Sequence, residues 1–190
     1  MKNNSFHFRS KSHEKAVRMV VPILRKYSFI VAPHGREVNA KLEGLLDRQD
    51  DRCSLMVRYR PDLIAAKQSW RACLCEVKAS GLIEARAFRG LQEWNKGGDI
   101  AFIVSCPDPF NYAKAAWIDA LQPEPDTVRV PRRFDFDQQY PAIQKLFPQS
   151  DIKPVSYNGS GSGTPYFPLP ESLMRPLDKF IEEELLAGAI

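Results

Sequence analysis

The sequence predicts a mixed α/β domain, in which helices pack against a central sheet. Strand-like and helix-like patterns alternate along residues 12–130, and residues 99–106 (DIAFIVSC) form an apolar run bounded by turn residues. Alternating patterns favour a layered α/β architecture, and an uninterrupted apolar run is typical of a buried central strand. The chain has 190 residues, 44% of them hydrophobic, which is enough for one such domain with its own core.

The first expected elements are a helix and a short strand. Residues 12–27 carry apolar side chains at helical spacing, with Ser12 as the expected N-cap. Pro22 lies inside this stretch and, because it lacks a backbone donor, is expected to kink the helix or shift its start. Residues 28–32 form a short β-like run.

Together with the remaining elements, this helix and this strand give the order helix, strand, strand, strand, helix, strand, helix, strand, which predicts a mixed sheet flanked by helices. The remaining elements are strands at 54–66 and 70–78 forming a hairpin through a turn at 67–69, a helix at 84–96, the strand at 99–106, a helix at 110–121 and a strand at 127–130. We assign residues 1–147 to this domain. Residues 148–190 are interpreted as a C-terminal extension, with a Gly/Ser-rich linker and a helix at 171–186.

Positive charge is concentrated at the start of the chain. Residues 1–27 contain seven Lys and Arg residues but a single acid, Glu14, so their net charge is +6. The net charge of the whole chain is +4, so the other residues together carry −2. A basic segment on a near-neutral body suits a polyanionic partner such as nucleic acid. A solvated helix face explains the same charges equally well.

Three ionisable residues interrupt the central hairpin. Asp62 follows a proline, and Glu76 and Lys78 stand in the apolar segment RACLCEVKAS. Because side chains alternate along a strand, Leu74, Glu76 and Lys78 should face one way, while Cys73, Cys75 and Val77 pack on the other side. Buried charges of this kind are costly unless they are paired or bind a metal. A structural Glu–Lys pair on a solvent-facing strand is the alternative, but it does not account for Asp62.

The segments RPDLIA and CEVKAS, in this helix, hairpin, helix and strand context, resemble the PD-(D/E)xK nuclease superfamily over roughly residues 10–130. In size and layout the chain is most similar to Holliday-junction-resolvase-like and RecB-like nuclease domains. The resemblance implies a restriction-endonuclease-like core. It also implies catalysis by Asp62, Glu76 and Lys78, with one or two Mg²⁺ ions, for which Mn²⁺ would substitute, held by Asp62, Glu76 and the carbonyl of Val77.

Two further site residues fit the family pattern. Glu14, three and seven residues before Val17 and Val21, would be the metal-binding acid of the first helix, or would instead pair with a neighbouring Lys or Arg. Gln92 would be the polar catalytic residue of the helix after the lysine, or a simple polar flank. Six basic residues are candidates for DNA-backbone contacts, with solvated helix faces as the alternative: Lys11, Lys15, Arg18, Arg86, Arg89 and Lys96.

The function expected from these residues is a Mg²⁺-dependent deoxyribonuclease of DNA recombination, repair or phage DNA processing. The chain has little room for a separate recognition domain, which favours selection of junctions, flaps, single strands or ends. The alternatives are a non-catalytic nucleic-acid-binding or protein-assembly module on the same fold. The expected partners are DNA and a second copy through the C-terminal helix, or a larger DNA-processing complex to which the tail is tethered.

The expected location is the cytoplasm of a bacterial or phage-infected cell. The four cysteines sit in or beside apolar runs, as buried residues of a reducing compartment do. The sequence contains no apolar stretch of the roughly 18 residues that a membrane-spanning helix requires, so no membrane association is expected.

Overall fold

The structure is a computed structural model of the 190-residue chain. It describes residues 4–34, 52–53, 56, 59–68, 72–96, 100–124, 127–131, 141, 144–145, 155–157 and 165–187.

A six-stranded mixed sheet forms the centre of the molecule, with the strand order β1-β2-β3-β5-β6-β10. Only β3 and β5 are parallel, and the other neighbours are antiparallel. The strands are β1 (Ile30–Pro33), β2 (Leu63–Ala66), β3 (Cys73–Lys78), β5 (Ala101–Ser105), β6 (Lys114–Trp117) and β10 (Arg175–Pro176). The expected α/β class with a mixed central sheet is therefore confirmed.

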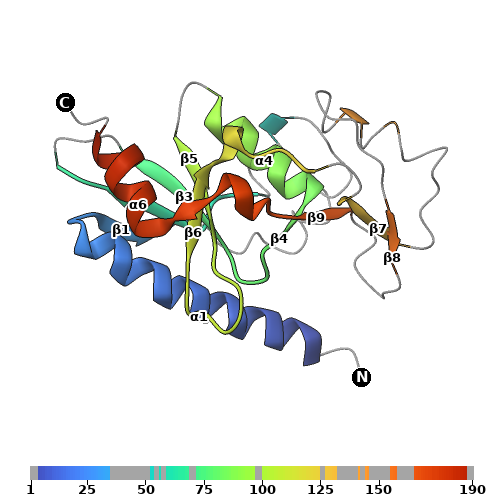
Figure 1. Cartoon of the computed structure of the whole chain (residues 1–190), viewed down its shortest axis with the longest axis horizontal. Helices are drawn as coiled ribbons and strands as arrows, with labels where there is room; N and C mark the ends of the chain where they lie inside the picture. The colour runs from blue at the N-terminus through green and yellow to red at the C-terminus, as the bar shows by residue number, and fades with distance from the viewer. Residues whose placement is uncertain are drawn as a thin grey trace.

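Helices cover both faces of this sheet (Figure 1). On one face, α1 (Asn4–Lys26) and α6 (Leu177–Phe180) pack on a core that includes Val20, Phe102 and Phe180. On the other face, α4 (Ala85–Asn95) packs on a core that includes Phe88, Ile103 and Phe167. The sheet thus separates two hydrophobic cores, and its strands are apolar on both sides.

Helix α1 begins earlier than expected, at Asn4, so Ser12 lies inside the helix and the N-cap prediction was wrong. Its buried stripe consists of Ala16, Val20 and Leu24, each fully buried. Pro22 stays within the helix, and its side chain is exposed. The helix ends where Ser28 adopts the left-handed conformation, with φ of +66°.

Helix α4 is fixed to the sheet at its C-terminal end by one buried side chain. Asn95 Oδ1 accepts hydrogen bonds from the backbone N–H groups of Ile100 (2.8 Å) and Ala101 (2.6 Å), at the start of β5. Asn95 Nδ2 donates to Asp119 of the segment after β6. This side chain satisfies backbone groups that would otherwise be buried without partners.

A second, four-stranded sheet lies beside α4, with the order β4-β9-β7-β8. Its strands are β4 (Leu82–Glu84), β9 (Tyr166–Pro168), β7 (Arg129–Pro131) and β8 (Val155–Tyr157). The strand expected at 127–130 is therefore present, but it belongs to this smaller sheet. Figure 1 shows it at the end of the molecule opposite β1.

The helix expected at 110–121 was wrong. Residues 114–117 form β6, which pairs antiparallel with β5 through Val104 and Ala115, and a 3₁₀ turn follows at Ile118–Ala120. Alternate side chains of β6 enter the two cores, Ala115 on the α1 side and Ala116 on the α4 side. Alanine favours helices, but this intrinsic propensity is overridden here by burial of the segment between the two layers.

The described residues 165–187 share a sheet and a core with earlier parts of the chain. The helix expected at 171–186 starts only at Leu177, after a 3₁₀ turn and strand β10, and continues past Phe180 as a π-helical stretch, Ile181–Leu186. Strand β10 pairs with β6, and the apolar side of the helix enters the core through Leu177, Phe180, Ile181 and Leu185. The boundary expected at residue 147 therefore separates segments that share one sheet and one core.

Among the helices described, none combines the length and the apolar character needed to cross a membrane.

Candidate active site

The hairpin of β2 and β3 positions the first two acidic residues. Leu63 pairs with Cys75, so Asp62, which lies in a bend just before β2, stands across from Glu76. Asp62 Oδ2 accepts a hydrogen bond of 2.8 Å from the backbone N–H of Val77. This bond holds the Asp62 carboxylate against the C-terminal end of β3.

Glu76 and Lys78 lie side by side on the face of β3 that looks toward α4. Leu74 of the same face belongs to the α4 core, while Cys73, Cys75 and Val77 belong to the α1 core, as face alternation predicts. Lys78 Nζ donates a hydrogen bond to Glu76 Oε1. Glu76 is only 8% exposed, so the alternative of a solvent-facing Glu–Lys pair does not describe this strand.

His13 of α1 completes the group. Its Nε2 lies 3.2 Å from Asp62 Oδ1, so the two oxygens of Asp62 contact a helix on one side and a strand on the other. The structure therefore brings together His13, Asp62, Glu76 and Lys78, from α1, the bend before β2, and β3.

Burial and these contacts shift the pKa values of all four groups. Desolvation raises the pKa of Glu76 to about 7, against the opposing effect of Lys78. Desolvation also disfavours the Lys78 ammonium, but the charge of Glu76 and its hydrogen bond outweigh it and raise the pKa of Lys78. Glu76 is therefore protonated more readily than an ordinary glutamate, while Lys78 keeps its charge.

Asp62 and His13 shift in opposite directions, as an ion pair does. Burial disfavours the Asp62 carboxylate, but the hydrogen bond and charge of His13, with smaller contributions from Lys78 and Val77, hold its pKa below the usual value. The hydrogen bond to Asp62 raises the pKa of His13 against the effect of its own desolvation.

The other two predicted site residues lie farther from this group. Glu14 follows His13 on α1 with an exposed side chain, so it is His13 that reaches Asp62. Gln92 is half-buried on α4, and its Oε1 lies 3.5 Å from Nη1 of Arg89. Roles for Glu14 in metal binding and for Gln92 in catalysis stay predictions.

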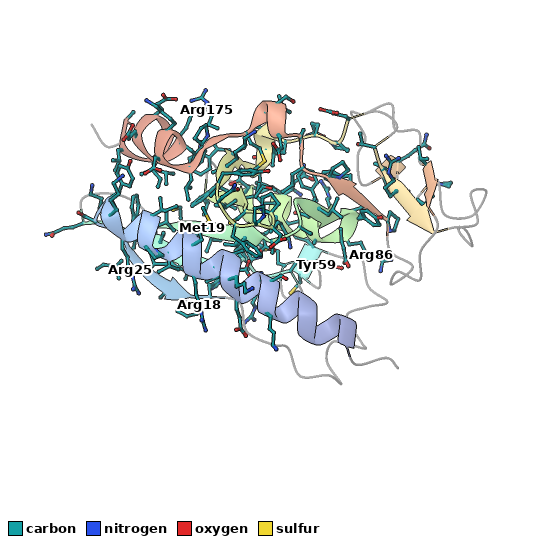
Figure 2. All side chains as sticks on the ribbon, turned by 60° about the horizontal axis from the view of Figure 1, so that its bottom comes forward. Arg18, Met19, Arg25, Tyr59, Arg86 and Arg175 are labelled. Carbon is teal, nitrogen blue, oxygen red and sulfur yellow. The ribbon has the colours of Figure 1, made fainter. Side chains whose placement is uncertain are left out.

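The predicted DNA-contacting residues fall into two groups. Lys11, Lys15 and Arg18 have exposed side chains on α1, and Arg18 points outward from the helix in Figure 2. Arg89 and Lys96 on α4 instead surround Glu93, a carboxylate only 4% exposed, together with Arg52. Arg86 lies half-buried on α4, at a distance from Arg18 (Figure 2). The α1 residues are thus available to a ligand, while Arg89 and Lys96 already neutralise a buried acid.

The donor set fits a hard divalent cation with few protein ligands. Within the described part of the chain, no cluster of three or more His, Cys, Asp and Glu side chains is close enough to hold a metal ion. Mg²⁺ commonly uses one or two carboxylates and keeps several waters, so Asp62 and Glu76 with the Val77 carbonyl match its needs better than those of Zn²⁺. Glu76 Oε2 is buried and has no hydrogen-bond partner among the described residues, which leaves one oxygen available to a cation.

Sequence reasoning missed Ser105 and gave His13 a smaller role than its contacts indicate. His13 was considered only as a weak candidate for contact with the phosphate beside Glu14, and not as a partner of Asp62; the fully buried stripe of α1 runs through Ala16, Val20 and Leu24. His13 is three residues before Ala16 and lies on that stripe. Ser105, the last residue of β5, is buried opposite Lys78 and carried no signal beyond a polar residue ending an apolar run.

No protein-family model and no curated protein sequence matches this chain.

Proposed function

We propose that this protein is a Mg²⁺-dependent nuclease of the PD-(D/E)xK type, acting on DNA. The observation that carries the proposal is the position of Asp62 across the hairpin from Glu76, with Lys78 beside it and one oxygen of the buried Glu76 without a partner. Burial raises the pKa of Glu76 to about 7, so its ionised form destabilises the folded chain unless a cation binds the carboxylate.

The order of elements supports the restriction-endonuclease-like core within this proposal. Helix α1, the antiparallel strands β1, β2 and β3, helix α4 and the strand β5, parallel to β3, follow the helix, three strands, helix and strand of that core, with the short strand β4 inserted between β3 and α4. Beyond β5 the chain adds β6, the other strands of the small sheet, and β10 and α6.

Each residue has a role that follows from its contacts. Asp62 and Glu76 supply carboxylate oxygens, and the Val77 N–H fixes the orientation of Asp62. The Lys78 ammonium, held at the same edge, can orient a water against a phosphodiester and offset negative charge that develops on the phosphate. A bound divalent cation would supply Lewis-acid stabilisation and lower the pKa of a bound water.

His13 adds a donor that the family resemblance did not supply. When protonated it balances the charge of Asp62, and its side chain is 41% exposed, so it can also reach a phosphate oxygen from the α1 side. The exposed Lys11, Lys15 and Arg18 continue a positive surface along the same helix. A nucleic acid bound at the site would therefore contact α1 through its backbone.

The test is a Mg²⁺-dependent cleavage assay on linear duplex, single strand, flap and four-way junction DNA. Wild type should cut at least one of these, while Asp62→Ala and Lys78→Ala should lose on the order of a hundredfold or more in rate. Lys179→Ala, which removes an exposed lysine of α6, is the matched control and should cut like wild type.

Cleavage that persists undiminished in both site variants would refute the assignment. Tight, salt-dependent DNA binding without any cleavage would favour the alternative of a non-catalytic binding module. The ion pairs Glu76–Lys78 and Asp62–His13 support that alternative, because the charged groups already neutralise one another. The proposed dimer would have to use the outer, acidic side of the C-terminal helix, because its apolar side is buried in the chain's own core.

A further inference from the structure

A buried hydroxyl lies next to the catalytic lysine of the proposed site. Ser105 ends β5, whose other residues are all apolar, and it is only 1% exposed. In the parallel pairing of β3 and β5 it is in register with Lys78, so the two side chains project to the same face of the sheet. Ser105 Oγ has no hydrogen-bond partner among the described residues. An unsatisfied buried hydroxyl disfavours the folded state, so Ser105 Oγ can take a hydrogen bond from a neighbouring group of the site.

The surroundings of this hydroxyl restrict which group can bind it. Gly81, with φ of +64°, folds the turn after Lys78 over Ser105, and a Cβ atom at Gly81 would lie 3.5 Å from Ser105 Oγ. On the other side of β5, Ser105 is in register with Lys114, but the Lys114 ammonium is held by Glu171 at 2.8 Å. The ammonium of Lys78, in register with Ser105 on the other neighbouring strand, is the donor that we consider for Ser105.

Lys78 needs another hydrogen-bond acceptor only when a cation binds the Glu76 carboxylate. In this structure Lys78 Nζ donates to Glu76 Oε1, while Glu76 Oε2 lacks a partner among the described residues. A divalent cation on the Glu76 carboxylate repels the ammonium and competes for the same oxygen. Because Lys78 is largely buried, its charge needs an acceptor close by, a role that Ser105 would share with the carboxylates of Asp62 and Glu84, whose charges also act on Lys78.

We propose that Ser105 is a positioning residue that accepts a hydrogen bond from the displaced Lys78 ammonium, directly or through one water, when Glu76 binds a divalent cation. The inference rests on the proposed function, since it assumes a cation at Glu76. It assigns to Ser105 the task of keeping Lys78 at the reacting phosphate after Glu76 has released it.

The experiment measures Mg²⁺ affinity by calorimetry in the full-length protein, without DNA, for wild type, Ser105→Ala, Lys78→Met and the double variant. Ser105→Ala should weaken Mg²⁺ binding on the order of tenfold, because the displaced ammonium loses a charged hydrogen bond. In the Lys78→Met background the same substitution should have no effect. In a Lys114→Met background it should keep its full effect, and Ser80→Ala, which removes an exposed hydroxyl of the neighbouring turn, should bind Mg²⁺ like wild type.

Thermal unfolding in EDTA separates this role from a structural one. Ser105→Ala should unfold at the same or a higher temperature than wild type, because it removes an unsatisfied buried hydroxyl. In cleavage assays Ser105→Ala should lower kcat by tenfold or more with KM for DNA changed less than twofold, and Ser105→Thr, which keeps the hydroxyl, should restore part of kcat.

Three results would overturn the inference. Equal Mg²⁺ affinity of wild type and Ser105→Ala would remove Ser105 from the site while leaving the proposed function intact. An equal loss of affinity in the Lys78→Met background would show that Ser105 does not act through Lys78. Absence of Mg²⁺ binding by the wild type would refute both the inference and the proposed function.

Discussion

Replacing Glu76 by glutamine should change how the stability of the metal-free protein depends on pH. Glu76 is 8% exposed and its pKa rises from 4.5 to about 7 on folding, mainly through desolvation. A raised carboxyl pKa means that the folded chain binds a proton more tightly than the unfolded one. The associated stability is therefore complete below pH 4.5 and is lost as the pH rises to about 7.

The size of the effect follows from the shift. Each pKa unit corresponds to about 1.4 kcal/mol, so ionising Glu76 in the folded chain costs about 3 kcal/mol of unfolding free energy. In Glu76→Gln this loss is absent. The difference in unfolding free energy between the variant and the wild type should thus grow by about 3 kcal/mol in favour of the variant from about pH 4.5 to about pH 8.

Urea unfolding in EDTA at several pH values measures this difference. Glu124→Gln makes the same chemical change at an exposed position and should keep the pH dependence of the wild type. Adding Mg²⁺ at about pH 8 should stabilise the wild type and leave Glu76→Gln almost unchanged, because the cation requires the ionised carboxylate. A difference between wild type and Glu76→Gln that does not vary with pH would refute the buried, ionisable Glu76 on which the site is built.

Three further predictions concern the surroundings of the site. His13→Ala removes the main group that lowers the pKa of Asp62, so the stability that ionised Asp62 contributes above pH 3.8 should be reduced, and the unfolding free energy should fall less on acidification than in the wild type, measured by urea unfolding at several pH values. Lys15→Ala should lower the slope of the logarithm of the DNA-binding constant against the logarithm of the salt concentration by about one, measured by fluorescence titration. Arg89→Ala should instead mainly lower the melting temperature, because Arg89 neutralises the buried Glu93. Phe180→Ala should cost about 3–5 kcal/mol in urea unfolding and keep a single transition, and two separate transitions would show that the C-terminal segment folds independently.

The strands around the site could be predicted because their side-chain patterns are local. The alternation of Cys73, Leu74, Cys75 and Glu76 assigns each side chain to a face of the sheet, and the structure places them there. Strand β3, α4 and the buried β5 likewise lie close to their expected positions. Of the strand expected at 54–66, only Leu63–Ala66 form β2; residue 56 is helical and residues 59–62 form turn, bend or coil, so that strand was predicted too long.

The missed features depend on tertiary contacts or on the exact phase of a helix. The sequence of β6 carries no strand signal of its own, and its conformation follows from pairing with β5 and β10. On α1, a shift of one residue rotates a side chain by about 100°, which is the difference between exposed Glu14 and the site residue His13. The expected stripe included Val20 and Leu24, which are fully buried, but not Ala16, because a small side chain contributes little to a hydrophobic pattern.

The contact between the first helix and the last one has a consequence for how the chain reaches this structure. Tyr27 donates hydrogen bonds to Asp178 and Glu182 across 151 and 155 residues of sequence, and Phe180 joins the core that Val20 and Leu24 also line. Contacts between such distant residues close large loops and slow folding. During synthesis, the apolar side of α1 cannot be fully covered until Leu177–Phe180 and the helical turn after it have been made. We therefore expect α1 to stay open to chaperones while the strands between the two helices are being synthesised.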